Sequence, residues 1–265
     1  MNADAWIIRP FNAVFCGVLA AFLLILAVAS ALLRRKDERV RQGVIVAASL
    51  LTLIGFFIYK AYLAADQEYD AITQATGGFN WWGELPLQLC NINMLLIPIA
   101  VLSKKRPLLS FCFFVGPLGA LMALLVPGNG FEGYSLLLPR MIGYYGTHFA
   151  IIIEALALVT FGLYKPRFRD LPMTLLTLIG VTVLIYGLNL LMRATGLHPN
   201  ANYFFTVETE GNALLSLFYK WLPVPSLYLI VPGSAMLMVY MLIVMLILTA
   251  IDRLSGRKNG EERGR

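Results

Sequence analysis

Seven long apolar stretches, separated by short charged segments, dominate this sequence. They cover residues 11–33, 42–59, 85–102, 108–126, 141–163, 171–192 and 227–251. A helix needs about 20 mostly apolar residues to cross about 30 Å of hydrocarbon, and these stretches are close to that length. Because a backbone within lipid must satisfy its own hydrogen bonds, the sequence predicts an all-α, polytopic membrane protein. We expect one bundle of seven transmembrane helices, a single domain over residues 1–265.

Composition excludes the main alternative classes. Hydrophobic residues make up 59% of the chain and charged residues 14%, whereas a soluble domain has about 25% charged residues. Too few charges remain to cover a soluble surface. The net charge of +6 is expected to set the orientation in the membrane, so nucleic-acid binding is not predicted. Three cysteines and two histidines are too few for a disulfide scaffold or a zinc cluster.

Lys and Arg are unevenly distributed among the connections between the apolar stretches. The segments 34–41, 103–107 and 164–170 and the chain end after 251 are rich in them, whereas 60–84, 127–140 and 193–226 are poor. Positively charged connections stay on the cytoplasmic side. The sequence therefore predicts an N-terminus outside, a cytoplasmic C-terminus and a multi-pass location in the cell membrane. Within the last outer segment, Ala213–Trp221 is expected to form a short amphipathic helix at the membrane surface.

Polar side chains within the predicted spans gather at one depth. At about 1.5 Å per residue, Cys90 and His148 lie about 8 and 10 Å from the outer ends of their spans. Polar groups inside a membrane are costly and face the interior of the bundle. The same layer holds amides and a phenol that could orient a base or bind an oxyanion, namely Gln88, Asn91, Asn93, Asn189 and Tyr186.

A thiol beside an imidazole is the minimal set for thiol acyl chemistry. A buried cysteine is inert unless a base or a cation activates it, and His148 has the right depth to do so. Cys112 lies near the inner end of its span, and Cys16 has apolar neighbours. Structural interpretations stay open, because a membrane cysteine is commonly a small apolar filler and His or Asn commonly joins helices. No cofactor motif and no metal-ligand set is predicted.

Residues 85–90 read Leu-Pro-Leu-Gln-Leu-Cys. This motif resembles the start of the third span in the YwaF-like integral membrane protein family, which is related to transmembrane protein 164 of animals. Further segments resemble that family in the same order, namely 116–121 with Pro127, 145–148, 202–204 and 212–215. The resemblance covers about residues 40–250.

The resemblance implies a phospholipid acyltransferase that works without coenzyme A or another cofactor. It assigns the nucleophile to Cys90 and the base to His148, with membrane phospholipids and lysophospholipids as substrates. Asn202 and Tyr203 would belong to a loop that meets the substrate. Two positions depart from the family pattern. Gln88 stands where the family usually has His, and the acidic stretch 207–210 replaces an often basic one, which argues against an anionic headgroup at this loop.

Three functions therefore follow from the sequence. In an acyltransferase, Cys90 would carry the acyl chain as a thioester, and water in place of the acceptor would make the protein a lipid hydrolase. In a carrier or channel, Glu154 and His148 would form a proton path, although no internal repeat is visible. In a non-catalytic protein, the same pocket would hold a lipid without changing it.

Overall fold

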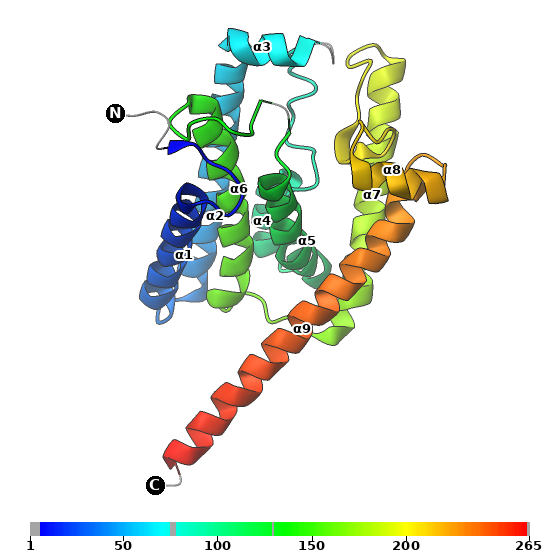
Figure 1. Cartoon of the computed structure of the whole chain (residues 1–265). Helices are drawn as coiled ribbons and strands as arrows, with labels where there is room; N and C mark the ends of the chain where they lie inside the picture. The colour runs from blue at the N-terminus through cyan, green and yellow to red at the C-terminus, as the bar shows by residue number, and fades with distance from the viewer. Residues whose placement is uncertain (1–5, 75–77, 129, 264–265) are drawn as a thin grey trace.

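The chain folds into a bundle of helices, seen in a computed structural model (Figure 1). The structure describes residues 6–74, 78–128 and 130–263, with the side chains of 213 and 255–263 left out. The helices are α1 (Ala13–Leu33), α2 (Glu38–Ala65), α3 (Gln67–Thr73), α4 (Ile92–Ser103), α5 (Arg106–Leu125), α6 (Pro139–Thr160), η3 (Phe168–Asp170), α7 (Leu171–Ala194), η4 (Tyr203–Phe205), α8 (Ala213–Trp221) and α9 (Leu227–Arg263).

Six helices of the described chain are long and apolar enough to cross a membrane: α1, α2, α5, α6, α7 with η3 before it, and α9. They confirm the prediction of an all-helical, multi-pass membrane protein. The short helix expected at Ala213–Trp221 is also confirmed as α8, where the Asn212 side chain accepts from the N–H groups of Leu214 and Leu215. That contact satisfies two of the free donors at the helix start.

The predicted span 85–102 differs from the structure in its first part. Residues 85–91 form turns, and α4 begins only at Ile92. Its 12 residues extend about 18 Å, which is shorter than the hydrocarbon core. Pro86 gives the physical reason, because it lacks an N–H donor and disfavours the helical conformation at Leu85. The residue that the sequence places inside a helix, Cys90, therefore lies just before one.

Helix α6 stands at the centre of the bundle and packs against α1, α2, α4 and α5. On the other side, α5 contacts α7, and α9 contacts α7 and α8. Figure 1 shows α3 lying across one end of the bundle and α9 crossing it obliquely, with its C-terminal half extending away from the other helices. One cluster of buried apolar side chains joins α1, α2, α4, α5 and α6, and the candidate site borders it.

The contact between α2 and α6 depends on one glycine and one acid. A Cβ atom on Gly143 would lie 2.2 Å from the Cβ of Tyr59, so only glycine allows the two helices to approach this closely. Further along α6, both carboxyl oxygens of the buried Glu154 accept hydrogen bonds from α2. The Ser49 hydroxyl donates at 2.8 Å and the Thr52 hydroxyl at 2.5 Å. Glu154 therefore joins two helices.

The connections rich in Lys and Arg lie together at one end of the bundle (Figure 1). Ion pairs connect them, between Lys104 and Glu38 at 2.6 Å, Arg106 and Asp170 at 2.5 Å, and Lys165 and Asp252 at 3.7 Å. At the opposite end the guanidinium of Arg140, 2% exposed, binds Asp66 at 2.8 Å and Glu68 at 2.9 Å. The charges are thus divided between the ends, as the alternation of the connections predicts.

We expect Arg140→Gln to lower the free energy of unfolding by about 2–3 kcal/mol, because it removes the buried member of an ion-pair network. Burial raises the pKa of Asp66, but hydrogen bonds from Arg140 and from backbone N–H groups outweigh burial and leave that pKa below its ordinary value. A lowered pKa stabilises the fold above about pH 4, and this contribution is lost as the pH falls through the folded-state pKa.

Thermal unfolding in detergent between pH 7 and pH 3 checks this expectation. The parent protein should lose more stability on acidification than Arg140→Gln, which has already lost the contact. Lys105→Gln, an exposed change at the other end, is the control and should leave both the stability and its pH dependence unchanged. Equal acid sensitivity of the parent and Arg140→Gln would contradict the assignment.

Candidate functional site

Cys90 lies two residues before the first residue of α4, with Asn91 as the capping residue between them. Its turn is closed by the N–H of Ile92, which donates to the carbonyl of Gln88 at 2.9 Å. The side chain is partly buried and packs against the apolar cluster between α2, α4, α5 and α6. A helix N-terminus favours negative charge, but burial among apolar side chains disfavours a thiolate more strongly, so this thiol needs a base to remove its proton.

Two neighbours fix the backbone of Cys90. The Asn93 side chain donates from Nδ2 to the carbonyls of Leu89, at 3.1 Å, and Cys90, at 3.3 Å. From α5, Gly119 lies so close that a Cβ there would be 3.3 Å from the Cys90 nitrogen. A larger residue at 119 would press on the turn. The predicted orienting amide Asn93 thus holds the backbone that carries the thiol.

His148 is buried on α6 with 4% of its surface exposed. Its Nδ1 lies 2.7 Å from the carbonyl of Tyr144, one turn earlier. A carbonyl can only accept, so Nδ1 carries the proton and a neutral ring has its free lone pair on Nε2. This tautomer leaves Nε2 able to accept a proton from another group.

Tyr144 connects the two predicted catalytic residues. Its ring centroid lies 4.5 Å from that of His148, and it belongs to the apolar cluster against which Cys90 packs. The hydroxyl donates to the carbonyl of Ala123 at 2.7 Å, and the ring stacks on Phe131 at 4.3 Å. Cys90 and His148 thus lie at one aromatic cluster. Among the hydrogen bonds of the described residues, none joins the two side chains directly.

An ion pair that the sequence analysis did not single out lies beside this cluster. Lys60 binds Glu84, and its ammonium lies 4.7 Å from the centre of the Tyr59 ring. The side chains of Lys60 and Glu84 are 9% and 18% exposed. The charge of Lys60 acts on both Cys90 and His148. The cation only partly offsets the burial that disfavours a thiolate at Cys90. The sequence signal for this ion pair was Lys60 itself, a single charge directly after the apolar stretch 42–59.

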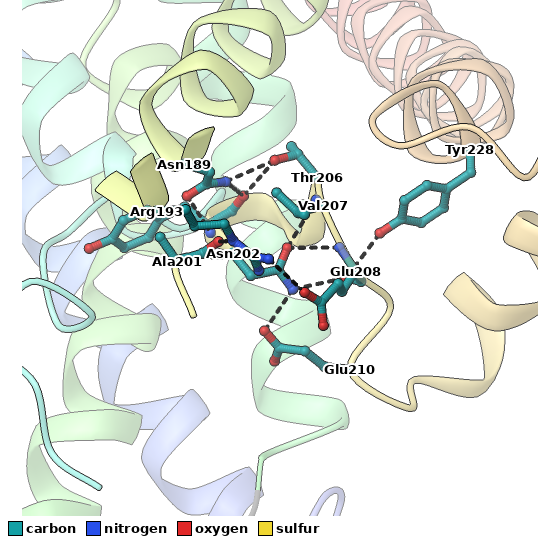
Figure 2. A network of polar contacts seen from close by, with 10 residues as sticks. Asn189, Arg193, Ala201, Asn202, Thr206, Val207, Glu208, Glu210 and Tyr228 are labelled. Atoms are coloured by element: carbon teal, nitrogen blue, oxygen red, sulfur yellow. Dashed lines mark hydrogen bonds and ion pairs between the residues drawn. The ribbon is translucent and has the colours of Figure 1, made fainter. Parts of the chain in front are cut away.

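The remaining predicted residues separate into those near the thiol and those in a second group. Asn91 stays near the thiol, and its Oδ1 is buried without a hydrogen-bond partner among the described residues. Tyr186 is half-buried on α7, and its hydroxyl makes no hydrogen bond to another described residue. Asn189 and Asn202 belong to the second group, a polar network between α7 and the segment 201–210 (Figure 2).

In that network both asparagine side chains bind backbone. Asn189 donates from Nδ2 to the carbonyl of Tyr203 at 2.9 Å and to the Thr206 hydroxyl at 2.8 Å. Asn202 accepts from the N–H groups of Val207 and Glu208 at 3.0 and 3.1 Å. The bonding capacity of both amides is used to shape the segment, so neither is free to bind an oxyanion.

Gln88 joins this segment to the Cys90 turn, because its Oε1 accepts from the N–H of Phe204 at 2.9 Å. A pocket of about 370 Å³ lies between the two parts, and its lining includes Gln88, Tyr203, Glu84, Arg193 and His198. Burial and the nearby Arg193 lower the pKa of His198, so its ring is neutral at pH 7. The pocket is thus polar, and its lining includes Gln88, which stands two residues before Cys90 in the sequence.

No group of three or more His, Cys, Asp or Glu side chains in the described part of the chain is arranged to hold a metal ion. What the site offers is a thiol at a helix N-terminus, a neutral imidazole and a polar pocket beside them.

Comparison with known proteins shows the family to which this chain belongs. No curated protein and no solved structure matches the chain. The model of the TMEM164 family matches residues 9–249, which include all of the site residues described above. The expected family resemblance is confirmed, and the chain belongs to the TMEM164 family.

Proposed function

We propose that this membrane protein is a phospholipid acyltransferase that works without coenzyme A and carries the acyl chain as a thioester on Cys90. One observation carries the proposal. Cys90 is fixed at the start of α4 beside the aromatic cluster that contains His148, and the Nδ1 bond to Tyr144 leaves Nε2 of His148 as the acceptor. Nucleophile and base with a set tautomer are the parts required for thiol acyl transfer.

In the first half-reaction, His148 Nε2 takes the proton of the Cys90 thiol. The thiolate attacks the ester carbonyl of a phospholipid, a C–S bond forms, and the ester C–O bond breaks. The departing lysolipid oxygen takes the proton back from the imidazolium. In the second half-reaction, the hydroxyl of an acceptor lysophospholipid gives its proton to Nε2 and attacks the thioester. A C–O bond forms, the C–S bond breaks, and the Cys90 sulfur regains the proton.

Three features of the fold stabilise the negative charge that develops on the sulfur and on the substrate oxygen during these steps. The positive end of the α4 helix dipole lies beside Cys90. Lys60 supplies a fixed positive charge. The Asn91 side chain caps no N–H group of α4, and we assign its Nδ2 donor to the oxyanion, whereas Asn93 positions the Cys90 backbone.

Intact-protein mass spectrometry tests the proposal. After incubation with a diacyl phospholipid, the parent protein should gain the mass of one acyl chain, and hydroxylamine, which cleaves thioesters, should remove it. Lysophospholipid should remove it faster than water if the protein is a transferase; the reverse order would make it a hydrolase. An unmodified protein that still converts phospholipid would contradict a covalent mechanism, and co-purified lipid without turnover would favour a lipid-binding protein.

The alternative of a proton-coupled carrier depends on Glu154, which binds Ser49 and Thr52 with both oxygens. This arrangement suits a contact between helices. We therefore expect Glu154→Gln to keep acyl transfer within about threefold of the parent, since a carboxamide retains an acceptor for α2. A carrier would show the opposite result, with gradient-driven uptake lost in Glu154→Gln and unaffected by changes at Cys90.

Seven membrane-crossing segments, with the N-terminus outside and α4 completing the count, remain part of the proposal. Labelling intact cells with an impermeant maleimide checks it, in a Cys16→Ser background. A cysteine at exposed Gln67 should react from outside, because its end of the bundle has few cations. A cysteine at exposed Lys105 should react only after permeabilisation. The reverse pattern would place the site in the inner leaflet of the membrane.

A further inference from the structure

Asn189 on α7 binds both backbone polar groups of one residue, Tyr203. Its Nδ2 donates to the carbonyl of Tyr203 at 2.9 Å, and its Oδ1 accepts from the N–H of the same residue at 3.0 Å. The side chain is completely buried. A carboxamide offers a donor and an acceptor side by side. An apolar side chain, or one with only donors or only acceptors, does not reproduce that pair. Asn189 therefore holds both the N–H and the carbonyl of residue 203 in place.

The residue after Tyr203 carries the connection to the thiol. Phe204 donates its N–H to Oε1 of Gln88. Phe204 and Phe205 have φ angles of 59° and 53°, a left-handed conformation that side-chain-bearing residues rarely adopt. Such a conformation persists only where surrounding contacts hold it. Asn189 supplies them on one side, and the Tyr228 hydroxyl, which donates to the carbonyl of Phe205, supplies them on the other.

Gln88 belongs to the turn that carries Cys90. Its carbonyl accepts from Ile92 at 2.9 Å, so both its backbone and its side chain are held. A shift of Phe204 would pull on Gln88 and displace the turn between residues 88 and 92. The thiol would then move relative to His148, which is carried by a different helix, α6.

We propose that Asn189 is a positioning residue for Cys90, acting through the backbone of residues 203 and 204 and the carboxamide of Gln88. The kinetic consequence rests on the proposed acyl transfer, whereas the placement of the thiol does not. Asn189 touches neither substrate nor thiol. From α7, it determines the position of the turn that carries Cys90.

Kinetics of three variants test the connection. Asn189→Leu and Gln88→Leu should each lower kcat about 10–100-fold with KM changed less than about threefold, because a displaced nucleophile affects the chemical step. The double variant should be no slower than the slower single variant, since both changes break one connection. Fold-reductions that multiply in the double variant would show two independent effects and overturn the proposal.

Two further variants separate positioning from a general loss of stability. Gln88→Glu keeps an oxygen that can accept from Phe204, so it should restore most of the activity that Gln88→Leu loses. Thr182→Val removes a buried hydroxyl on the same helix, whose one partner among the described residues is the carbonyl of Leu178. It should leave kcat unchanged. A loss in Thr182→Val as large as in Asn189→Leu would contradict a specific role.

Alkylation of Cys90 gives a readout that needs no turnover. In a Cys16→Ser background, with Cys112 fully buried, a membrane-permeant maleimide reports on Cys90. Asn189→Leu and Gln88→Leu should change its reaction rate at least about fivefold in the same direction. An unchanged rate in Asn189→Leu overturns the positioning inference. If the two variants show the predicted change in alkylation rate but the parent protein forms no thioester, the acyltransferase is refuted and the positioning role stays in place.

Discussion

Cys90→Ala is expected to abolish acyl transfer and the acyl adduct together. Without the sulfur no thioester can form, and loss of a catalytic nucleophile commonly costs about 10⁴-fold or more in rate. The fold should persist, because alanine fits the space that a partly buried cysteine occupies, and the backbone bonds from Asn93 and the close contact with Gly119 do not involve the sulfur. Acyl exchange between phospholipid and labelled lysophospholipid measures the loss.

Cys16→Ala is the matched control for that experiment. Cys16 is exposed on α1, outside the aromatic cluster, and its removal should leave the rate unchanged. A Cys90→Ala protein that unfolds at the parent temperature and still transfers acyl chains at the parent rate would rule out covalent catalysis at this thiol. Loss of activity in both variants would point to general damage.

His148→Gln should lower the rate of acyl transfer about 10²–10⁴-fold, the usual contribution of a general base. Glutamine keeps hydrogen-bonding groups and a similar size, so it can still occupy the position beside Tyr144. It cannot accept a proton at neutral pH. Because the imidazole acts in both half-reactions, thioester formation and its transfer to lysolipid should both slow down, and single-turnover mass spectrometry separates the two steps.

Tyr144→Phe is the control for the environment of His148. It removes the hydroxyl that donates to Ala123 but keeps the ring that contacts His148. We expect less than about a tenfold loss, since no proton passes through this hydroxyl in the proposed steps. If Tyr144→Phe loses as much as His148→Gln, or if His148→Gln keeps the parent rate, the mechanism with His148 as the base fails.

The membrane-spanning helices could be predicted from the sequence because each follows from the local energetics of burying backbone in lipid. The apolar stretches at 11–33, 42–59 and 171–192 correspond to α1, α2 and α7 within a few residues, apart from longer ends of α2. The charge pattern likewise predicted which connections share an end. Family motifs pointed to Cys90 and His148 before any geometry was known.

The start of α4 could not be predicted from apolar length. Residues 85–91 are as apolar as a span requires, but Pro86 and the contacts of the following turn keep them out of the helix. Those contacts come from elsewhere in the chain. Phe204 binds Gln88 across 116 residues of sequence. Gly119 of α5 leaves room for the Cys90 backbone to pack closely against that helix.

The sequence by itself determined the helical membrane architecture and the division of charge between its ends, because these depend on residue type and local spacing, and it made Cys90 and His148 the candidates for nucleophile and base. Tertiary structure alone decided what the amides do. Asn93, Asn189 and Asn202 look alike as polar residues near one layer, yet each binds backbone of a particular segment. The physical reason is that a buried carboxamide bonds to whichever donors and acceptors lie within its reach, and only the packed chain determines which groups those are; Oδ1 of Asn93 meets none among the described residues.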